Sequence, residues 1–109
     1  MFKVKVLGHL GGDPEMRYLP SGEAVCNFRL AFNFKKRDRI ETEWLKVAAW
    51  GEELAEQANL LAKGDLVQII GEVTFSYWTD ANGKERKSVD IRADSIVKVA
   101  LPGEPELET

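Results

Sequence analysis

Apolar and polar residues alternate along most of this chain, and this alternation restricts its fold more than any other feature. In the first segment, Val4 and Val6 lie on one side of an extended chain, and Lys3 and Lys5 lie on the other. A period of two residues is typical of a β-strand with one buried face. The sequence therefore predicts a first strand from Phe2 to Leu10.

Four further segments have the same alternation. The predicted strands run from Ala24 to Phe34, from Thr42 to Trp50, from about Val67 to Ser76, and onward from about Glu85. Breaker residues separate them, including an Asn-Gly pair before the last strand, which is a strong hairpin signal. Gly71 lies within the fourth strand, where it would allow a curled strand to bend.

The segment from Glu52 to Lys63 has a different period. Leu54, Ala58 and Leu61 recur at positions i, i+4 and i+7, which places them on one face of a helix of about three turns. Acidic residues in its first turn suit the positive end of the helix macrodipole. Five strands with one helix between the third and the fourth predict an all-β domain, the five-stranded OB-fold barrel, which hides its sheet edges by near closure.

The chain has the size and composition of one globular domain, with 109 residues, 44% hydrophobic and 30% charged. We expect that domain over residues 1–100 and a short disordered acidic tail over residues 101–109, which have two prolines and no pattern. A single cysteine, Cys26, and a single histidine, His9, provide no internal disulfide and no zinc ligand set. No apolar run is long enough for a membrane span, so we expect a cytoplasmic protein. We also expect no metal and no other cofactor.

The net charge of −3 does not exclude a nucleic-acid partner. Its whole excess lies on Glu104, Glu106 and Glu108, because residues 1–100 contain as many basic as acidic residues. Phosphate contacts are local, so a neutral domain can bind nucleic acid if its cations gather on one face.

The third predicted strand has two chemically different faces. Its core face is apolar, and its opposite face displays Trp44, Lys46 and Trp50. Exposed apolar clusters of this kind tend to mark binding surfaces. An indole ring can stack on any base and a neighbouring lysine can meet the phosphate, so this face predicts a site for single-stranded nucleic acid.

Trp78 repeats this chemistry near the tip of the hairpin between the fourth and fifth strands. A charged run forms the loop of the other hairpin, after the second strand. A basic groove that contains aromatic rings suits single strands better than duplex grooves. The basic candidates of this groove are Lys35, Lys36, Arg37, Lys46, Lys84, Arg86 and Lys87.

The pattern leaves a second interpretation open for each candidate. Trp44 and Trp50 could equally be covered by the helix or by a partner subunit, and Trp78 could pack within its hairpin. The charged run from Lys35 to Arg39 could be a solvated loop, and the acidic residues of the helix could serve its macrodipole alone. The chain has no phosphate-binding glycine loop and no metal-ligand spacing, so it predicts neither an enzyme nor a metal site.

Several short motifs occur in the order found in bacterial single-stranded-DNA-binding proteins. They include Gly8-His9-Leu10-Gly11, Asp13-Pro14-Glu15-Met16-Arg17-Tyr18, Thr42-Glu43-Trp44, Trp50-Gly51 and Trp78-Thr79-Asp80. The match extends over about residues 1–100, and the shared order is far more specific than any one motif. The chain therefore resembles this family.

The resemblance implies a non-enzymatic OB-fold protein that protects unpaired DNA during replication, recombination and repair, in the cytoplasm and associated with the nucleoid. It also implies a homo-oligomer with DNA wrapped around it, a tetramer with a dimer as the alternative. It places base-stacking aromatics and basic contacts at Trp44, Trp50, Trp78, Lys3, Lys46, Lys63 and Arg86.

Three positions depart from the family pattern. Lys36 replaces a further stacking tryptophan of many relatives, so we expect phosphate attraction there, with Phe34 nearby as a stacking candidate. Leu45 stands where relatives often have a histidine linked to subunit contacts. Residues 101–109 lack the acidic tip with a Pro-Phe pair that recruits replication and repair proteins, so we do not expect recruitment by that route.

Two other functions agree with the same sequence. A tail-less, primosome-type accessory protein of this fold would act mainly through protein contacts, often as a dimer. An RNA-binding OB module would use the same stacking and phosphate contacts.

Overall fold

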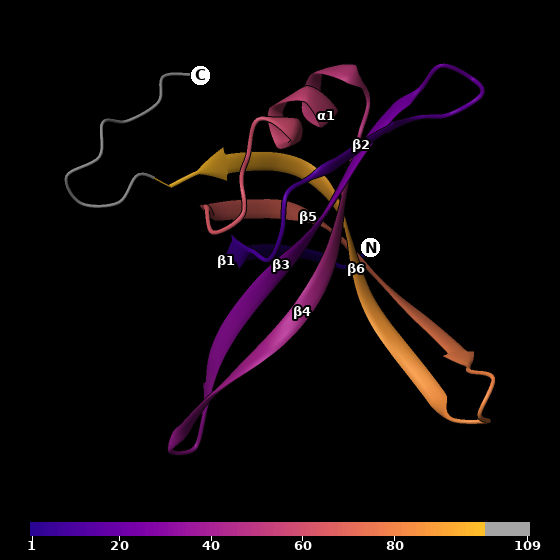
Figure 1. Cartoon of the computed structure of the whole chain (residues 1–109). Helices are drawn as coiled ribbons and strands as arrows, with labels where there is room; N and C mark the ends of the chain where they lie inside the picture. Colours follow the sequence, from indigo (N-terminus) through magenta and orange to yellow (C-terminus); the bar gives the residue numbers. More distant parts are fainter. Residues whose placement is uncertain (100–109) are drawn as a thin grey trace.

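The computed structural model describes residues 1–99, so the predicted tail and the end of the predicted domain at residue 100 lie outside the described residues. Figure 1 shows the arrangement of the elements. In chain order they are β1 (Lys3–Leu10), β2 (Glu15–Tyr18), β3 (Ala24–Lys36), β4 (Arg39–Trp50), α1 (Glu52–Asn59), β5 (Leu66–Thr79) and β6 (Glu85–Lys98).

Five of the strands form a closed barrel. The order of hydrogen-bonded neighbours is β1-β5-β6-β4-β3, and β1 returns to β3 where His9 and Leu10 pair with Ala31 and Leu30. The neighbours β4 and β6 are parallel, and the other pairs are antiparallel. With the helix between β4 and β5, this topology confirms the predicted OB-fold barrel.

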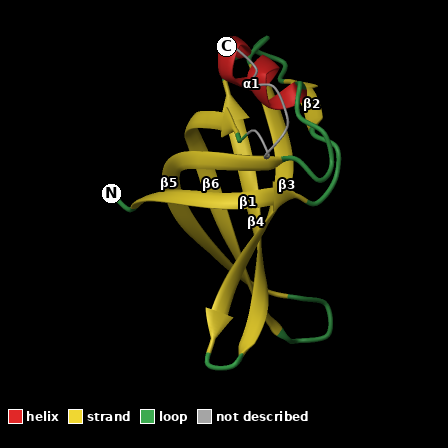
Figure 2. Ribbon diagram, turned by 90° about the vertical axis from the view of Figure 1, so that its left-hand side faces the viewer, coloured by secondary structure: helices red, strands yellow, loops and turns green. Residues whose placement is uncertain are grey.

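The alternating apolar residues of the predicted strands build one core. Leu30, Val47, Ile69 and Ile91 each expose 2% or less of their surface. Full burial of such side chains stabilises the fold by about 1.5–3 kcal/mol each. Helix α1 contributes the buried Ala55 and Ala58 to the same core and covers one end of the barrel (Figure 2).

Helix α1 ends four residues earlier than the predicted helix, which extended to Lys63. After Asn59, the N–H groups of Leu60 and Leu61 donate to carbonyl oxygens only three residues back, and the next two N–H groups donate to side chains instead of continuing the helix. The N–H of Ala62 donates to a carboxylate oxygen of Asp65 at 2.9 Å, and the N–H of Lys63 donates to Oδ1 of Asp13 at 3.1 Å. These contacts turn the chain into β5, and the predicted helix end was therefore wrong. Among residues 1–99, no helix is long and apolar enough to cross a membrane.

The alternation pattern missed the short strand β2. In β2 the alternation is weak, since Met16 alone is half-buried and the other three residues are exposed. It pairs with β3 outside the barrel, with Met16 opposite Cys26. Cys26 itself is fully buried in the core, and this burial raises the pKa of its thiol.

Strand β5 bends at Gly71, as the sequence predicted. Its pairing with β6 shifts register between Ile70 and Gly71. A Cβ atom at Gly71 would overlap the backbone oxygen of Arg92, so the close approach of the two strands requires glycine here.

Two hairpins extend beyond the barrel, at the end opposite to α1 (Figure 2). The first joins β3 to β4, and the second joins β5 to β6. The predicted loop from Lys35 to Arg39 is shorter than expected, because Lys36 pairs with Arg39 and the turn contains only Arg37 and Asp38. Charged residues are compatible with strands here, since both sides of the hairpin tip meet solvent.

Candidate nucleic-acid interface

The outward-facing residues of four neighbouring strands, β3, β4, β6 and β5, form one continuous surface. On β4, Lys46 lies opposite Arg29 of β3 and beside Asp90 of β6, and Asp90 lies opposite Thr74 of β5. Residues paired in this way point to the same side of a sheet. We call this surface the tryptophan face and define it by Arg29, Trp44, Lys46, Trp50, Thr74, Trp78, Arg86, Asp90 and Arg92.

The core-facing and outer residues of β4 separate as its alternation predicted. Leu45 and Val47 are buried, whereas Trp44 and Lys46 are exposed. Trp44 exposes 46% of its surface and Trp50 is half-buried, so α1 does not cover Trp44.

The indole of Trp44 is held between two neighbours. The guanidinium carbon of Arg29 lies 4.7 Å from the centre of the ring, which is a cation–π contact. The second neighbour is Gly11. The ring lies against the backbone of Gly11, and a Cβ atom on Gly11 would overlap Cζ3 of the indole. The backbone N–H of Gly11 donates to the backbone oxygen of Arg29 at 2.9 Å, so both neighbours are fixed relative to each other.

Trp50 borders a groove between β4 and β6. The groove has a volume of about 290 Å³ and is lined in part by Lys46, Thr74 and Arg92. The guanidinium carbon of Arg92 lies 6.0 Å from the centre of the Trp50 ring. Cations and an aromatic ring therefore meet along a shallow channel of the kind that single strands occupy.

One acid, Asp90, lies within this groove, and its oxygen atoms accept hydrogen bonds from two serines. Ser76 donates to Oδ2 of Asp90 at 2.9 Å, and Ser88 donates to the same oxygen at 3.2 Å. The two hydroxyls occupy part of the hydrogen-bond acceptor capacity of the carboxylate, so fewer acceptor sites remain for other donors.

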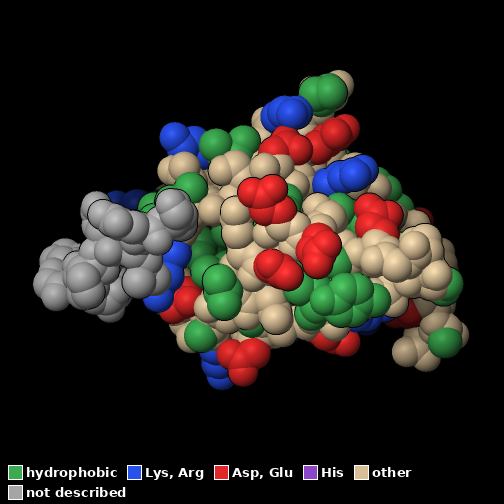
Figure 3. Space-filling view, turned by 90° about the horizontal axis from the view of Figure 1, so that it is seen from above, with side chains coloured by type: hydrophobic (Ala, Val, Ile, Leu, Met, Phe, Trp, Pro, Cys, Tyr) green, Lys and Arg blue, Asp and Glu red, His purple; other side chains and the backbone are tan. Residues whose placement is uncertain are grey.

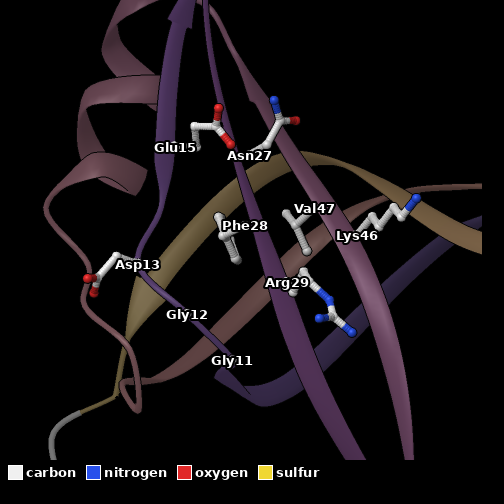
Figure 4. Close-up of a pocket in the computed structure, with 9 residues that line it drawn as sticks. All are labelled: Gly11, Gly12, Asp13, Glu15, Asn27, Phe28, Arg29, Lys46 and Val47. Atoms are coloured by element: carbon white, nitrogen blue, oxygen red, sulfur yellow. The ribbon is translucent and has the colours of Figure 1, made fainter.

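A second hollow of about 420 Å³ adjoins the groove and shares Asn27, Lys46 and Val47 with it (Figure 4). Its walls come from the Gly11-Gly12 turn, from the start of β2, and from β3 and β4. It carries two carboxylates, from Asp13 and Glu15, whereas the groove carries one, from Asp90.

Trp78 lies on the tryptophan face near the tip of the β5-β6 hairpin and exposes 46% of its surface. Its pairing partner is Arg86, whose Nε donates to Asp80 at 3.0 Å. Asp80 also accepts backbone hydrogen bonds from Asn82 and Lys84 at 2.9 Å each. The hydrogen bond from Lys84, followed by that from Arg86, lowers the pKa of the Asp80 carboxyl. Asp80 thus organises the turn and fixes Arg86 beside the indole.

The other predicted cations are spread more widely. Lys35 lies on the outer side of the β3-β4 hairpin and Lys84 lies in the turn of the second hairpin. Lys3 is paired with Asp94 at 2.9 Å, at the margin of the tryptophan face. Lys63 lies in the connection between α1 and β5, where its backbone N–H donates to Asp13.

Two predicted site residues near the tip of the β3-β4 hairpin, Phe34 and Lys36, do not lie on the tryptophan face. Phe34 pairs with Glu41, on the side of the hairpin that continues the core, and it stacks on Phe32 with ring centres 5.9 Å apart. Lys36 alternates with Lys35 and lies on the same side as Phe34. The structure therefore separates Phe34 and Lys36 from Trp44.

Sequence reasoning missed Arg29 and Arg92, the two guanidinium groups that lie over the indoles. Both residues alternate with core residues of their strands, so the sequence shows that they face outward. Their neighbours depend on strand pairing across the barrel, in particular on the parallel contact of β4 with β6. A single strand pattern does not contain that information.

The end of the molecule that α1 covers has the opposite charge. Figure 3 shows acidic side chains gathered on this end. A hollow there is lined by Glu52, Glu53 and Asp94, and it reaches Trp50 from the side opposite to Lys46. The cationic stretch of the surface therefore ends at Trp50.

A closed barrel of five strands with exposed indoles and arginines on its outer face defines an OB-fold binding protein with an interface suited to unpaired nucleic acid. The chain matches the model of the single-strand binding protein family over residues 1–99, and it belongs to this family. It is 35% identical over 95 residues to "Single-stranded DNA-binding protein 1" of Synechocystis sp., an alignment that covers 85% of this chain and 78% of that protein. The family consists of binding proteins, so the chain is not an enzyme.

Proposed function

We propose that this protein binds single-stranded DNA of any sequence along the tryptophan face and protects it during replication, recombination and repair. The family and the name of the Synechocystis relative support the ligand. The observation that carries the proposal is the exposed indole of Trp44, because it lies beside Arg29 on the same face as the groove lined by Lys46 and Arg92.

In this mechanism, the bases stack on the indoles. Trp44 and Trp50 are six residues apart on β4, which corresponds to about 20 Å along the strand. That distance leaves room for several nucleotides between the two rings. Each stacked base contributes about 1–3 kcal/mol, and stacking tolerates any sequence because every base has a π-face.

The cations of the face bind the backbone. Lys46 and Arg92 flank the groove, and Arg86 is held beside Trp78 by Asp80. Every phosphate that they neutralise releases condensed counterions, so affinity falls as salt rises, with a slope of about −0.7 per contact for single strands. A bound strand therefore passes from Trp44 past the groove toward the second hairpin.

The test is a titration of intrinsic tryptophan fluorescence with oligo-dT at two salt concentrations. We expect strong quenching that weakens at high salt. A variant with Trp44→Ala and Trp50→Ala should bind about 100-fold more weakly, because it loses two stacking sites. The matched control is Tyr18→Ala, since Tyr18 is also an exposed aromatic but lies on β2. Unchanged affinity in the double variant would remove both indoles from the site.

The same titration distinguishes DNA from RNA. An RNA oligomer of matching length and sequence should compete less well than the DNA, and equal competition would favour an RNA-binding module.

We further propose that the protein is located in the cytoplasm, associated with the nucleoid.

We further propose that the chain forms a homotetramer, and its outer surface on the other side of the barrel supports self-association. Leu7 of β1 and Val97 of β6 both pair with Gln68, and they expose 53% and 48% of their surface. Sedimentation should therefore give four times the mass of one chain, and Leu7→Glu should lower it. A monomer would contradict the proposal, and a dimer would favour the accessory-protein alternative.

A further inference from the structure

The hollow beside Trp44 is lined by two carboxylates as well as by cations, whereas the neighbouring groove has only the carboxylate of Asp90, which already accepts hydrogen bonds from Ser76 and Ser88. Glu15 and Asn27 lie side by side at one end of the hollow, and Arg29 and Lys46 lie at the other (Figure 4). A carboxylate without such donors would repel a phosphate, since both groups are anions. The mixed lining therefore suits a ligand that has hydrogen-bond donors at one edge and acceptors at another.

Strand register fixes the spacing of these groups. Glu15 pairs with Asn27 across β2 and β3, and Arg29 follows Asn27 by two residues on the same side of β3. Such diagonal neighbours have Cα atoms about 7–8 Å apart, which is the scale of a purine with its substituents. Among residues 1–99, none of Glu15, Arg29 and Lys46 has an ion-pair partner, so their charged groups remain available for a ligand.

The Gly11-Gly12 turn leaves the third side of the hollow without side chains. A Cβ atom at Gly12 would meet nothing within 4 Å, and Gly11 lies against the indole of Trp44. A base in the hollow would therefore be the neighbour of a base stacked on Trp44. Its volume of about 420 Å³ lies within the range of small-molecule sites, about 300–1,000 Å³.

Guanine is the base whose edges match this lining. It presents two adjacent donors, N1–H and the N2 amino group, which one carboxylate can accept together. It also presents the acceptors O6 and N7, for which arginine and lysine are the commonest protein donors. Thymine offers a single N–H between two carbonyl oxygens, and those oxygens would face the carboxylate unfavourably.

We propose that this hollow is a guanine subsite, in which Glu15 accepts from the donor edge and Arg29 or Lys46 donates to O6 and N7. The inference rests on the proposed binding of single strands and adds a base preference at one position of an otherwise sequence-independent path. Glu15 and Asn27 are then specificity-determining residues.

The test compares three 15-mers in the fluorescence titration: dT15, the same oligomer with one central dG, and the same oligomer with central deoxyinosine, which lacks the N2 amino group. We expect the dG oligomer to bind about fivefold more tightly than dT15. Deoxyinosine should lose most of this gain. Equal affinity for dT15 and the dG oligomer would overturn the guanine subsite and leave the proposed function intact.

Variants assign the preference to Glu15. Glu15→Gln should lower the affinity ratio of the dG oligomer to dT15 from about five to about one, because an amide cannot accept from both donors. The control is Glu43→Gln, which removes the same charge from an exposed residue on the other side of β4. A ratio near five in Glu15→Gln would refute the assignment. If dT15 itself failed to bind the wild-type protein, the proposed function and the subsite would both be wrong.

Discussion

The two sides of β4 carry residues of different kinds on one backbone. The inner side presents Leu45, Val47 and Ala49, which are buried and contact the other barrel strands. The outer side presents Trp44 and Lys46, which are exposed to solvent. For Trp44 this is unusual, because tryptophan has the largest apolar side chain. The inner side can be explained by stability alone. The outer side cannot, because an exposed indole stabilises the fold less than a buried one.

This difference distinguishes residues that stabilise the barrel from residues that we expect to bind the ligand. The strand alternation places the two sets only one residue apart, so neighbouring substitutions should have opposite signatures in stability and in binding.

The largest effect should come from truncation on the inner side. Leu45→Ala should lower the free energy of unfolding by about 2–5 kcal/mol, since it removes buried methyl groups and leaves a cavity. Trp44→Ala, one residue away, should change stability much less and weaken oligo-dT binding. Urea unfolding and fluorescence titration of both variants measure the two quantities. A Trp44→Ala protein as unstable as Leu45→Ala would mean that the indole is structural.

The next effect concerns the support of Trp44. Gly11→Ala should displace the indole, because the added Cβ overlaps Cζ3 of the ring, and we expect about tenfold weaker binding and less quenching. Gly12→Ala is the matched control, since its Cβ would have nothing within 4 Å. If both variants bound oligo-dT alike, the position of Trp44 would not depend on Gly11.

Much of the fold could be predicted from the sequence because the barrel strands alternate strongly. The core residues Leu30, Val47, Ile69 and Ile91 and the bend at Gly71 all follow from local pattern and breaker chemistry. The strand β2 and the end of α1 could not be predicted in this way. They depend on an edge pairing with β3 and on the carboxylates of Asp13 and Asp65, which are remote contacts.

The candidate site divides along the same line. The outward direction of Trp44 and Trp50 follows from the period of β4. The two arginines over the indoles and the mixed hollow beside Gly11 require the pairing of four strands, so they emerged only from the structure. Phe34 shows that neighbours in sequence need not share a site, because successive residues of a strand point to opposite sides and Phe34 therefore lies on the opposite side from Lys35.

A smaller effect should separate the two charges that meet at Trp50. Arg92→Gln should reduce the slope of log affinity against log salt by about 0.7, the value for one phosphate contact on a single strand. Glu52→Gln lies in the acidic hollow on the other side of Trp50 and should leave the slope unchanged. Titrations of oligo-dT at four salt concentrations give both slopes. Equal slopes in the wild type and in Arg92→Gln would exclude Arg92 from the strand path.

The smallest effect tests an outer residue that serves the fold. Hydrogen bonds from Lys84 and Arg86 lower the pKa of the Asp80 carboxyl, so the ionised form is favoured more in the folded than in the unfolded chain. Its contribution to stability is therefore present at neutral pH and is lost as the pH falls below about 4, through the lowered pKa. Asp80→Asn should be less stable than the wild type at pH 7, and urea unfolding should show this difference shrinking in acid. Asp38→Asn, which removes the same charge from the turn of the other hairpin, is the matched control. A difference for Asp80→Asn that stayed constant from pH 7 to pH 3 would show that the charge of Asp80 does not hold the second hairpin and Arg86 in place.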